Sequence, residues 1–294
     1  MSTYYCLVAG LPDISLDDGK LSYSVSDFKA ELYPDLSAQD RKLIDLFYLK
    51  FDNTAILKLL KNKDAVIEDK GNFSAEELLQ LIEAVREGDT PDKKYPSYLV
   101  NFVSQYLQLS QDELYRADDL LAALYYSYGM SSNNAFIASW FEFNLNLNNI
   151  LAALAARKYK MEVSSVIVGA TSICEQLRTS NARDFGLNET LEYFEALQRI
   201  ADIEELVERE KKVDMLKWKW LEDESFFHYF TIERIFVFLM QLEMIERWIS
   251  LDKEKGNELF RKMIQDLKNE VQIPEEFRKS LIPQHFDLTL FISS

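Results

Sequence analysis

Apolar residues recur every three to four positions along most of this chain, which is the period of an α-helix. The segment 37–51 is typical: Leu43, Ile44 and Phe47 fall on one face of a helix that Ser37 is suited to cap. Gly and Pro, which interrupt helices, number only 8 and 6 in 294 residues. The pattern therefore predicts an all-α protein.

The same pattern predicts helices along nearly the whole chain. Their approximate limits are residues 27–33, 38–51, 75–87, 98–108, 111–128, 134–160, 188–223, 231–252 and 255–271. The first is expected to be capped by Ser26 and to end before Pro34. Residues 89–96 form the clearest linker, and the chain after Pro274 is expected to be irregular.

Three stretches need closer attention. Residues 4–9 fit either a short strand or one or two helical turns, ended by Gly10 and Pro12. The asparagines within 144–149 predict an interruption of their helix. Residues 188–223 fit either a single extended helix or a helical hairpin.

The helical pattern at residues 43–60 recurs further along the chain. A shift of 94 residues brings Asp52 onto Asn146, and a further shift of 95 residues aligns a third apolar pattern at 232–249. Because Asp and Asn often cap helices, a helix–break–helix unit is expected in the first two copies. Unrelated amphipathic helices can also be aligned in this way, so the absence of any repeat is the alternative. The repeat predicts three related helical units at residues 1–95, 96–190 and 191–294.

Acidic residues dominate the charge: 49 Asp and Glu oppose 33 Lys and Arg, which gives a net charge of −16. Such a surface repels nucleic-acid backbones and anionic lipid headgroups, so neither nucleic acid nor direct lipid binding is expected. No apolar stretch approaches the roughly 20 residues that span a membrane, and the N-terminus lacks a basic signal-peptide segment. The sequence predicts a soluble cytoplasmic protein, with Cys6 and Cys174 as reduced, buried thiols.

Residues with catalytic or metal-binding potential are few. There is no Gly-rich phosphate loop, and His228 and His285 are the only histidines. Glu224 and His228 are spaced to share a metal, but a packed histidine is the better interpretation. We therefore expect no catalytic residue, metal, cofactor or small-molecule substrate; an all-α enzyme of unrecognised type is an alternative. The aromatic run 218–230 is suited to an interface, but core packing is favoured.

Three segments together resemble a known family. Residues 4–18, 141–161 and 233–256 are similar to an uncharacterised bacterial family associated with V/A-type rotary ATPases. Through that family they resemble the C-type subunit of those machines, which corresponds to the d-type subunit of eukaryotes. A recurring segment of that subunit reads Asp-Leu-x-Asn-Ile, followed by Leu, Arg and Lys. The positions that match it here are Asn146, Leu147, Asn149, Ile150, Leu154 and Arg157, while Ala155 stands where Arg is usual.

The resemblance implies three related helical domains that form a pseudo-threefold funnel or socket. It also implies a non-catalytic central-stalk adaptor, which couples the rotor shaft of a V/A-type ATPase to its membrane ring. Such a protein is cytoplasmic and lies at the inner membrane through protein contacts. The partner-binding residues expected from the matching segments are Asp52, Asn146, Asn149, Arg157, Glu243 and Arg247. Helix capping or a solvated salt bridge is the alternative role of each residue, and a helical scaffold for another protein is the alternative function.

Overall fold

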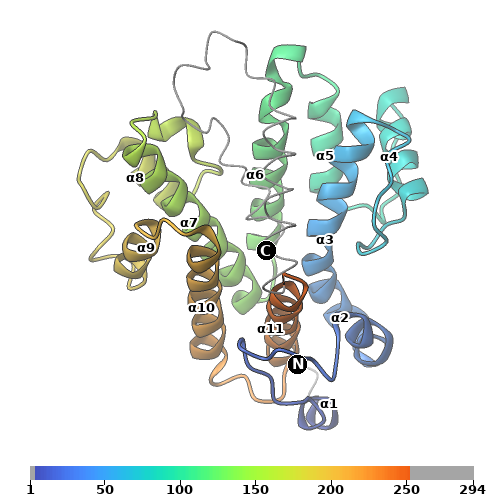
Figure 1. The fold of residues 1–294 in the computed structure, drawn as a ribbon. Coiled ribbons are helices and arrows are strands. Elements are labelled where there is room, and N and C mark those ends of the chain that lie inside the picture. The colour runs from blue at the N-terminus through green and yellow to red at the C-terminus, as the bar shows by residue number, and fades with distance from the viewer. Residues whose placement is uncertain (1–3, 252–294) are drawn as a thin grey trace. The chain divides into compact units, whose positions relative to one another are not determined.

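All the regular structure in residues 4–251, the part of the chain that the computed structural model describes, is helical (Figure 1). The α-helices are α1 (Tyr5–Ala9), α2 (Val25–Asp27), α3 (Ala38–Lys61), α4 (Ala75–Glu87), α5 (Ser97–Tyr106), α6 (Ala117–Met130), α7 (Ala135–Lys158), α8 (Ser172–Thr179), α9 (Phe194–Ala201), α10 (Leu206–Ser225) and α11 (Ile232–Ser250). Shorter π-helical and 3₁₀ segments are Phe28–Leu32, Tyr33–Asp35, Gln111–Arg116 and Val163–Val166. The all-α prediction is confirmed for this range. The helix predicted at 255–271 and the segment after Pro274 lie outside the described residues.

The described chain divides into two compact units. Unit 1 joins residues 4–38 to residues 206–251, and unit 2 comprises residues 39–205. Each unit therefore has its own set of packed helices. The predicted division into three units stays a prediction.

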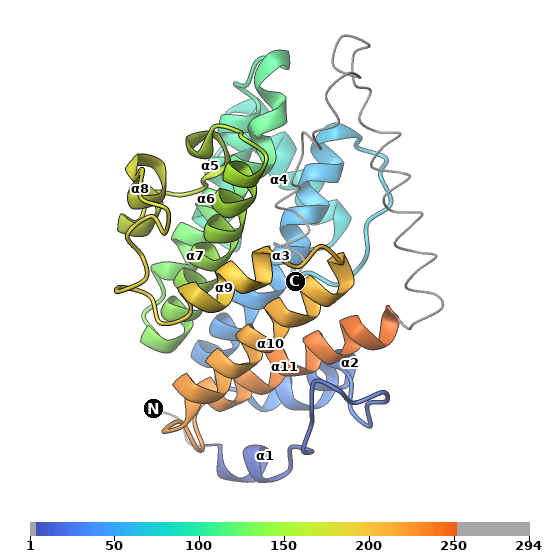
Figure 2. The ribbon, with the colours of Figure 1, turned by 60° about the vertical axis from the view of Figure 1, so that its left-hand side comes forward.

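In unit 2, α7 is the helix with the most neighbours: α6, α8 and α9 all pack against it (Figures 1 and 2). α5 packs in turn against α4 and α6. The approach of α6 to α7 is especially close at Gly129, where an added Cβ would lie 2.2 Å from the ring of Phe141. A glycine is required there because any side chain would displace the ring.

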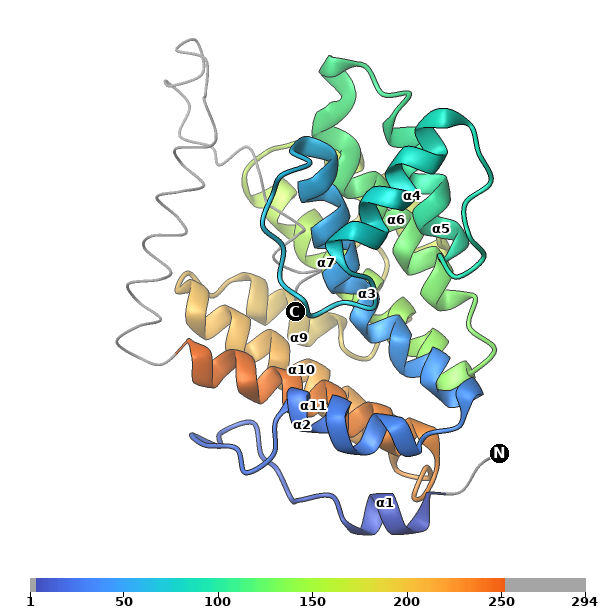
Figure 3. The same ribbon diagram turned by 90° about the vertical axis from the view of Figure 1, so that its right-hand side faces the viewer.

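In unit 1, α10 and α11 pack side by side, and α2 packs against α11 (Figure 3). The main-chain N–H of Val25, at the start of α2, donates to Oε1 of Glu246 on α11 at 2.8 Å. The short helix α1 is held through the N–H of Tyr4, which donates to the carbonyl of Phe230 at 2.8 Å. Unit 1 is thus built from the two ends of the described chain.

Several predicted details are corrected. α3 and α7 each run for 24 residues without a break, so the predicted interruptions at Asp52 and within 144–149 are wrong. Ser24, not Ser26, caps α2, and it does so reciprocally with Asp27. Of the two alternatives for residues 188–223, the single extended helix is wrong, because this range holds α9 and most of α10 as separate helices. Cys6 is exposed, while Cys174 is buried as expected.

Helices begin at a regular spacing along the sequence. α3, α7 and α11 begin at residues 38, 135 and 232, so each starts 97 residues after the previous one. α4 and α8, at residues 75 and 172, have the same spacing, as do α5 and α9, at residues 97 and 194. Three kinds of helix therefore recur with one period.

The burial at Tyr48 distinguishes this period from the predicted shift of 94 residues. At 97 residues, the buried Tyr48 of α3 corresponds to Leu145 of α7 and Leu242 of α11, which are both buried. At 94 residues, Tyr48 corresponds to Glu142, which is exposed. Core positions should match in related helices, so this position, together with the common spacing of the helix starts, favours 97 residues as the register.

Candidate interaction sites

Asp52, in the middle of α3, anchors the loop that leads to α4. Its side chain is only 1% exposed, and its carboxylate accepts the main-chain N–H groups of Asn72 at 2.9 Å and Phe73 at 3.0 Å. Gly71 packs so closely that an added Cβ would lie 2.1 Å from Oδ1 of Asp52. The carboxylate replaces water for these donors and fixes the loop to the helix.

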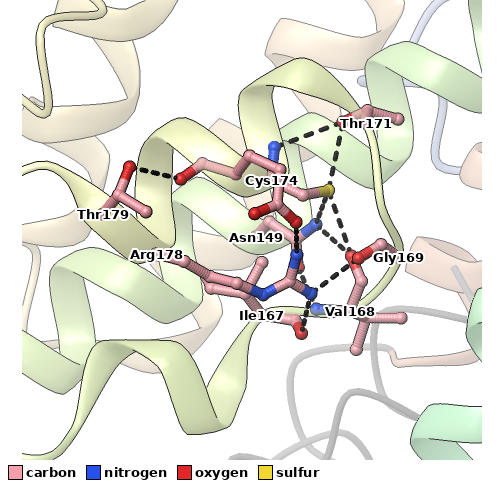
Figure 4. A network of polar contacts seen from close by, with 9 residues as sticks. Asn149, Ile167, Val168, Gly169, Thr171, Cys174, Arg178 and Thr179 are labelled. Carbon is pink, nitrogen blue, oxygen red and sulfur yellow. Dashed lines mark hydrogen bonds and ion pairs between the residues drawn. The ribbon is translucent and has the colours of Figure 1, made fainter.

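Asn149, in the middle of α7, anchors the loop that leads to α8 (Figure 4). Its Nδ2 donates to the carbonyl of Val168 at 2.8 Å, and its Oδ1 accepts the N–H of Val168 at 2.9 Å. Nδ2 also donates to Sγ of Cys174 at 3.3 Å. Both main-chain groups of Val168 are therefore satisfied by one buried amide.

Arg178 of α8 also holds this loop (Figure 4). Its guanidinium donates to the carbonyls of Ile167 at 3.0 Å and Gly169 at 2.6 Å, and it pairs with Glu175 at 2.6 Å. Thr171, whose hydroxyl accepts the N–H of Cys174, caps α8 directly after this loop. The loop is thus fixed to both helices that it connects.

Arg157, near the end of α7, clamps the segment that follows α8. Its guanidinium donates to the carbonyls of Ser180 at 2.8 Å, Ala182 at 2.5 Å and Arg183 at 2.9 Å. It also lies 3.4 Å from the centroid of the Phe185 ring, a cation–π contact. Burial lowers the pKa of Arg157, against a smaller opposing effect of Asp184. The donors of this residue are used within unit 2.

Asn146 lies one turn before Asn149 and is also buried. It hydrogen-bonds the hydroxyl of Tyr193, which lowers the pKa of that hydroxyl, but burial outweighs this effect and raises the pKa to about 12. Oδ1 of Asn146 has no hydrogen-bond partner among the described residues. Asn146 thus lies inside unit 2 and not on its surface.

Glu243 and Arg247 belong to a group of charged residues between α10 and α11. We call Glu210, Asp214, Lys217, Glu243 and Arg247 the charge cluster. Arg247 pairs closely with Asp214 and lies 3.8 Å from Glu210, while Nε1 of Trp248 donates to Asp214 at 2.7 Å. These contacts join the two helices of unit 1.

Lys217 is the unusual member of the charge cluster. Its side chain is 1% exposed, and its Nζ has no hydrogen-bond partner among the described residues. Burial lowers the pKa of Lys217, and the carboxylates of Asp214, Glu210 and Glu243 oppose this effect only in part. For Arg247 burial is also the largest effect, but Asp214, Glu243 and Glu210 together outweigh it and raise the pKa. The cluster is therefore asymmetric: Arg247 is well paired and Lys217 is not.

The six predicted residues are divided between the two units. Asp52, Asn146, Asn149 and Arg157 lie in unit 2, and Glu243 and Arg247 lie in unit 1. The alternative role of helix capping is wrong for Asp52 and Asn149, because both lie within helices, but their contacts are structural. Whether any of the six touches a partner stays a prediction.

Core packing, favoured by the sequence for the aromatic run before α11, is wrong for residues 226–230. Phe226, Phe227, Tyr229 and Phe230 are all exposed, with 82% exposure at Phe227. His228 lies 3.6 Å from Glu233, and no metal-binding group of side chains is found among residues 4–251. The sequence could not predict that these residues are exposed, because an aromatic run has the same sequence pattern in a surface turn as in a core.

A family model described as protein of unknown function (DUF2764) matches residues 1–271. The chain belongs to this family. No curated protein and no solved structure shows a significant match. The DUF2764 match covers every described residue, so it includes both units, and no described helix in it is long and apolar enough to cross a membrane.

Proposed function

We propose that this DUF2764 protein is a non-catalytic central-stalk adaptor of a V/A-type rotary ATPase. In this role it couples the rotor shaft to the membrane ring, as the resemblance of its three segments to the C-type subunit implies. It is a cytoplasmic protein held at the inner membrane by protein contacts. Three related helical units form its pseudo-threefold socket.

The observation that carries the proposal is the recurrence of helices every 97 residues. A threefold repeat requires three equivalent long helices, and α3, α7 and α11 have the required spacing. At the same position of these helices stand Asp52, Asn149 and Glu246. Each accepts a main-chain N–H from a segment outside its own helix: Asp52 and Asn149 from the loop that follows, and Glu246 from the start of α2. Equivalent polar anchors on equivalent helices support common descent of the three units.

The anchored loops suit a part that transmits torque. A socket that turns with a shaft must not yield at its loops, and Asp52, Asn149 and Arg157 fix the loops of unit 2 with several hydrogen bonds each. Asp52, Asn146 and Asn149 are almost fully buried, so we propose that they act on the shaft contact indirectly: Asp52 and Asn149 through the loops that they fix, and Asn146 through Tyr193. Arg247 and Glu243, which are half-buried, are the better candidates for direct contact.

The acidic surface fits the same role. A net charge of −16 disfavours a direct approach to anionic lipids, so a position at the membrane has to come from protein partners. A large preformed interface, and not a single strong contact, is then needed to resist slip.

Affinity purification of the tagged chain from detergent-solubilised membranes of its host, followed by mass spectrometry, tests the proposal. We expect the proteins of the shaft, the ring and the catalytic head together. A tagged Asp52→Ala variant should recover less of them, while Thr54→Ala, an exposed change on the same helix, should recover as much as the wild type. Recovery of the chain alone, from cells shown to contain the assembled ATPase, would reject the adaptor role.

A helical scaffold for another protein is the second candidate, and one observation favours it. An open groove of about 560 Å³ lies between α3 and α4 in unit 2. Its lining is mixed: Leu59, Leu60, Leu79 and Ile82 are apolar, and Lys63, Glu76, Gln80, Glu83 and Arg86 are charged or polar. A groove between helices that offers both kinds of side chain suits an amphipathic helix. Under this function the purification would return a partner that is no part of a rotary ATPase, and Leu79→Arg would prevent its recovery.

A further inference from the structure

Five exposed aromatic residues gather at one end of unit 1. They are Tyr5, Phe226, Phe227, Tyr229 and Phe230, which we call the exposed aromatic cluster. Tyr5 comes from α1, and the other four come from the connection between α10 and α11, beside which α1 lies in all three ribbon views (Figures 1–3). Exposed apolar groups that gather in one place are typical of interaction surfaces.

The rings of the cluster are held in place by one another and by the main chain. The centroids of Tyr5 and Phe230 lie 4.3 Å apart, and those of Phe226 and Phe227 lie 5.0 Å apart. The N–H of Tyr4 donates to the carbonyl of Phe230 at 2.8 Å, and the N–H of His228 donates to the carbonyl of Ser225 at 2.8 Å. A surface ordered in this way loses little conformational entropy on binding.

The fold itself does not require aromatic residues in this connection. The connection that leads into α7 has four residues, against six before α11, and is made by Ser131, Ser132, Asn133 and Asn134. Like Thr231 before α11, Asn134 directly precedes its helix, and these two positions are 97 residues apart. A helix at this position of the period can therefore be entered through polar residues alone, and the aromatic rings at 226–230 need a different explanation.

The charges beside the cluster indicate the chemistry of its partner. The last turn of α10 contains Glu222, Asp223 and Glu224, all exposed, and no basic residue. Negative charge at the C-terminal end of a helix is unfavourable, because the helix dipole is negative there too. A cationic partner would remove this repulsion, and its lysine or arginine side chains would also bind the faces of the exposed rings.

We propose that the exposed aromatic cluster, with the acidic end of α10, docks a basic amphipathic helix of another protein. The apolar face of that helix covers Phe226, Phe227 and Tyr5, and its cations face Glu222 to Glu224. A second copy of this chain is a poor occupant because both copies have a charge of −16, and an anionic membrane is repelled by the same charge. The proposal does not depend on the rotary role, since it rests on unit 1 alone.

The test uses the full chain and a synthetic helical peptide of leucine and lysine with one apolar and one basic face. Binding is followed by fluorescence anisotropy at two salt concentrations. We expect Phe226→Ser/Phe227→Ser to weaken binding by about tenfold or more, as loss of buried aromatic anchors does. Tyr115→Ser, which removes an aromatic residue of 60% exposure in unit 2, should leave binding unchanged.

Further arms separate the contributions. Glu222→Lys/Glu224→Lys should weaken binding and reduce its salt dependence, and a peptide of the same composition in scrambled order should bind poorly to every form. Phe227→Ser alone changes a residue that is 82% exposed, so it should leave the fold intact. Circular dichroism of the variant checks this. Equal binding of the peptide by wild type and both serine variants would overturn the proposal. So would cluster-dependent binding to phosphatidylcholine vesicles, or cluster-dependent dimerisation, without cluster-dependent peptide binding.

Discussion

Asp52 and Asn149 stand 97 residues apart, at the same position of two 24-residue helices, and each fixes the loop that leads to the next helix. The caps of those next helices, Ser74 and Thr171, are also 97 residues apart. Asp52 fixes its loop with a carboxylate, and Asn149 fixes its loop with a neutral amide. The common element is a buried oxygen that accepts main-chain N–H groups.

Asp52→Ala should lower the free energy of unfolding by about 2 kcal/mol or more, because buried main-chain donors lose their acceptor. Asn149→Ala should have a cost of similar size for the same reason. Thr54→Ala, on the exposed face of α3, should change the free energy by less than about 0.5 kcal/mol. Urea unfolding monitored by circular dichroism measures all three. If Asp52→Ala were as mild as the control, the carboxylate would not be an anchor.

Gly71→Ala should destabilise the protein by about 1–3 kcal/mol, because the new Cβ would overlap the Asp52 carboxylate. Gly19→Ala is the matched control, since nothing lies within 4 Å of a Cβ at that position. In an Asp52→Ala background the cost of Gly71→Ala should largely disappear, because the clashing carboxylate is gone. If the loss of stability in the double variant equalled the sum of the two single losses, the cost of Gly71→Ala would not come from its contact with Asp52.

Lys217→Met should leave stability unchanged or raise it, by up to about 3 kcal/mol, because it replaces a buried cation with no hydrogen bond by an apolar side chain of similar length. Asp214→Ala should instead cost about 3–5 kcal/mol, because it leaves Arg247 without its main partner. Thermal and urea unfolding of the two variants distinguish these outcomes. A large loss of stability in Lys217→Met would mean that its ammonium group has a structural partner.

Alkaline pH should destabilise unit 2 through its buried tyrosines. Burial raises the pKa of Tyr98 well above 10.0, and it raises that of Tyr126 as well. Above about pH 10 the unfolded chain loses these phenolic protons while the native protein keeps them, so stability falls as pH rises. The absorbance of tyrosinate should therefore rise over the same range of pH in which the protein unfolds. Tyr126→Phe should lose less stability than the wild type between about pH 8 and pH 11; an equal loss in both would contradict the assignment.

Helix positions were largely predictable because they depend on local pattern. The capping box of Ser74 and the left-handed Gly88 bound α4 where the sequence predicts. The continuity of α7 through 144–149 was not predictable in the same way: asparagine favours caps in isolation, but in α7 Asn148 donates to Tyr126 and Asn149 binds Val168. Tertiary partners about twenty positions away along the chain decided the local conformation.

The roles of the candidate residues also depend on tertiary contacts that the local sequence does not show. Asp52, Asn149 and Arg157 stand out in the sequence as polar residues in apolar surroundings, and the structure shows that loops of the same unit occupy them. The aromatic residues at 226–230 stand out as a cluster, but their exposure depends on where the turn between α10 and α11 lies. Lys217 has no distinguishing feature in the sequence, because a lysine in a charged helix is ordinarily solvated.

Unit 1 joins the N-terminal segment to residues that are synthesised much later, so it can complete its fold only late in translation. Val25 and Glu246, which bind each other, are separated by 221 residues, and at a synthesis rate of roughly 5–20 residues per second the first waits roughly 10 to 45 seconds for the second. Residues 39–205 emerge in between and have all of their own helices by then. Until α11 is made, α2 lacks the helix it packs against and Tyr23 lacks its ring contact with Phe238, so the nascent N-terminal segment is expected to need protection by a chaperone.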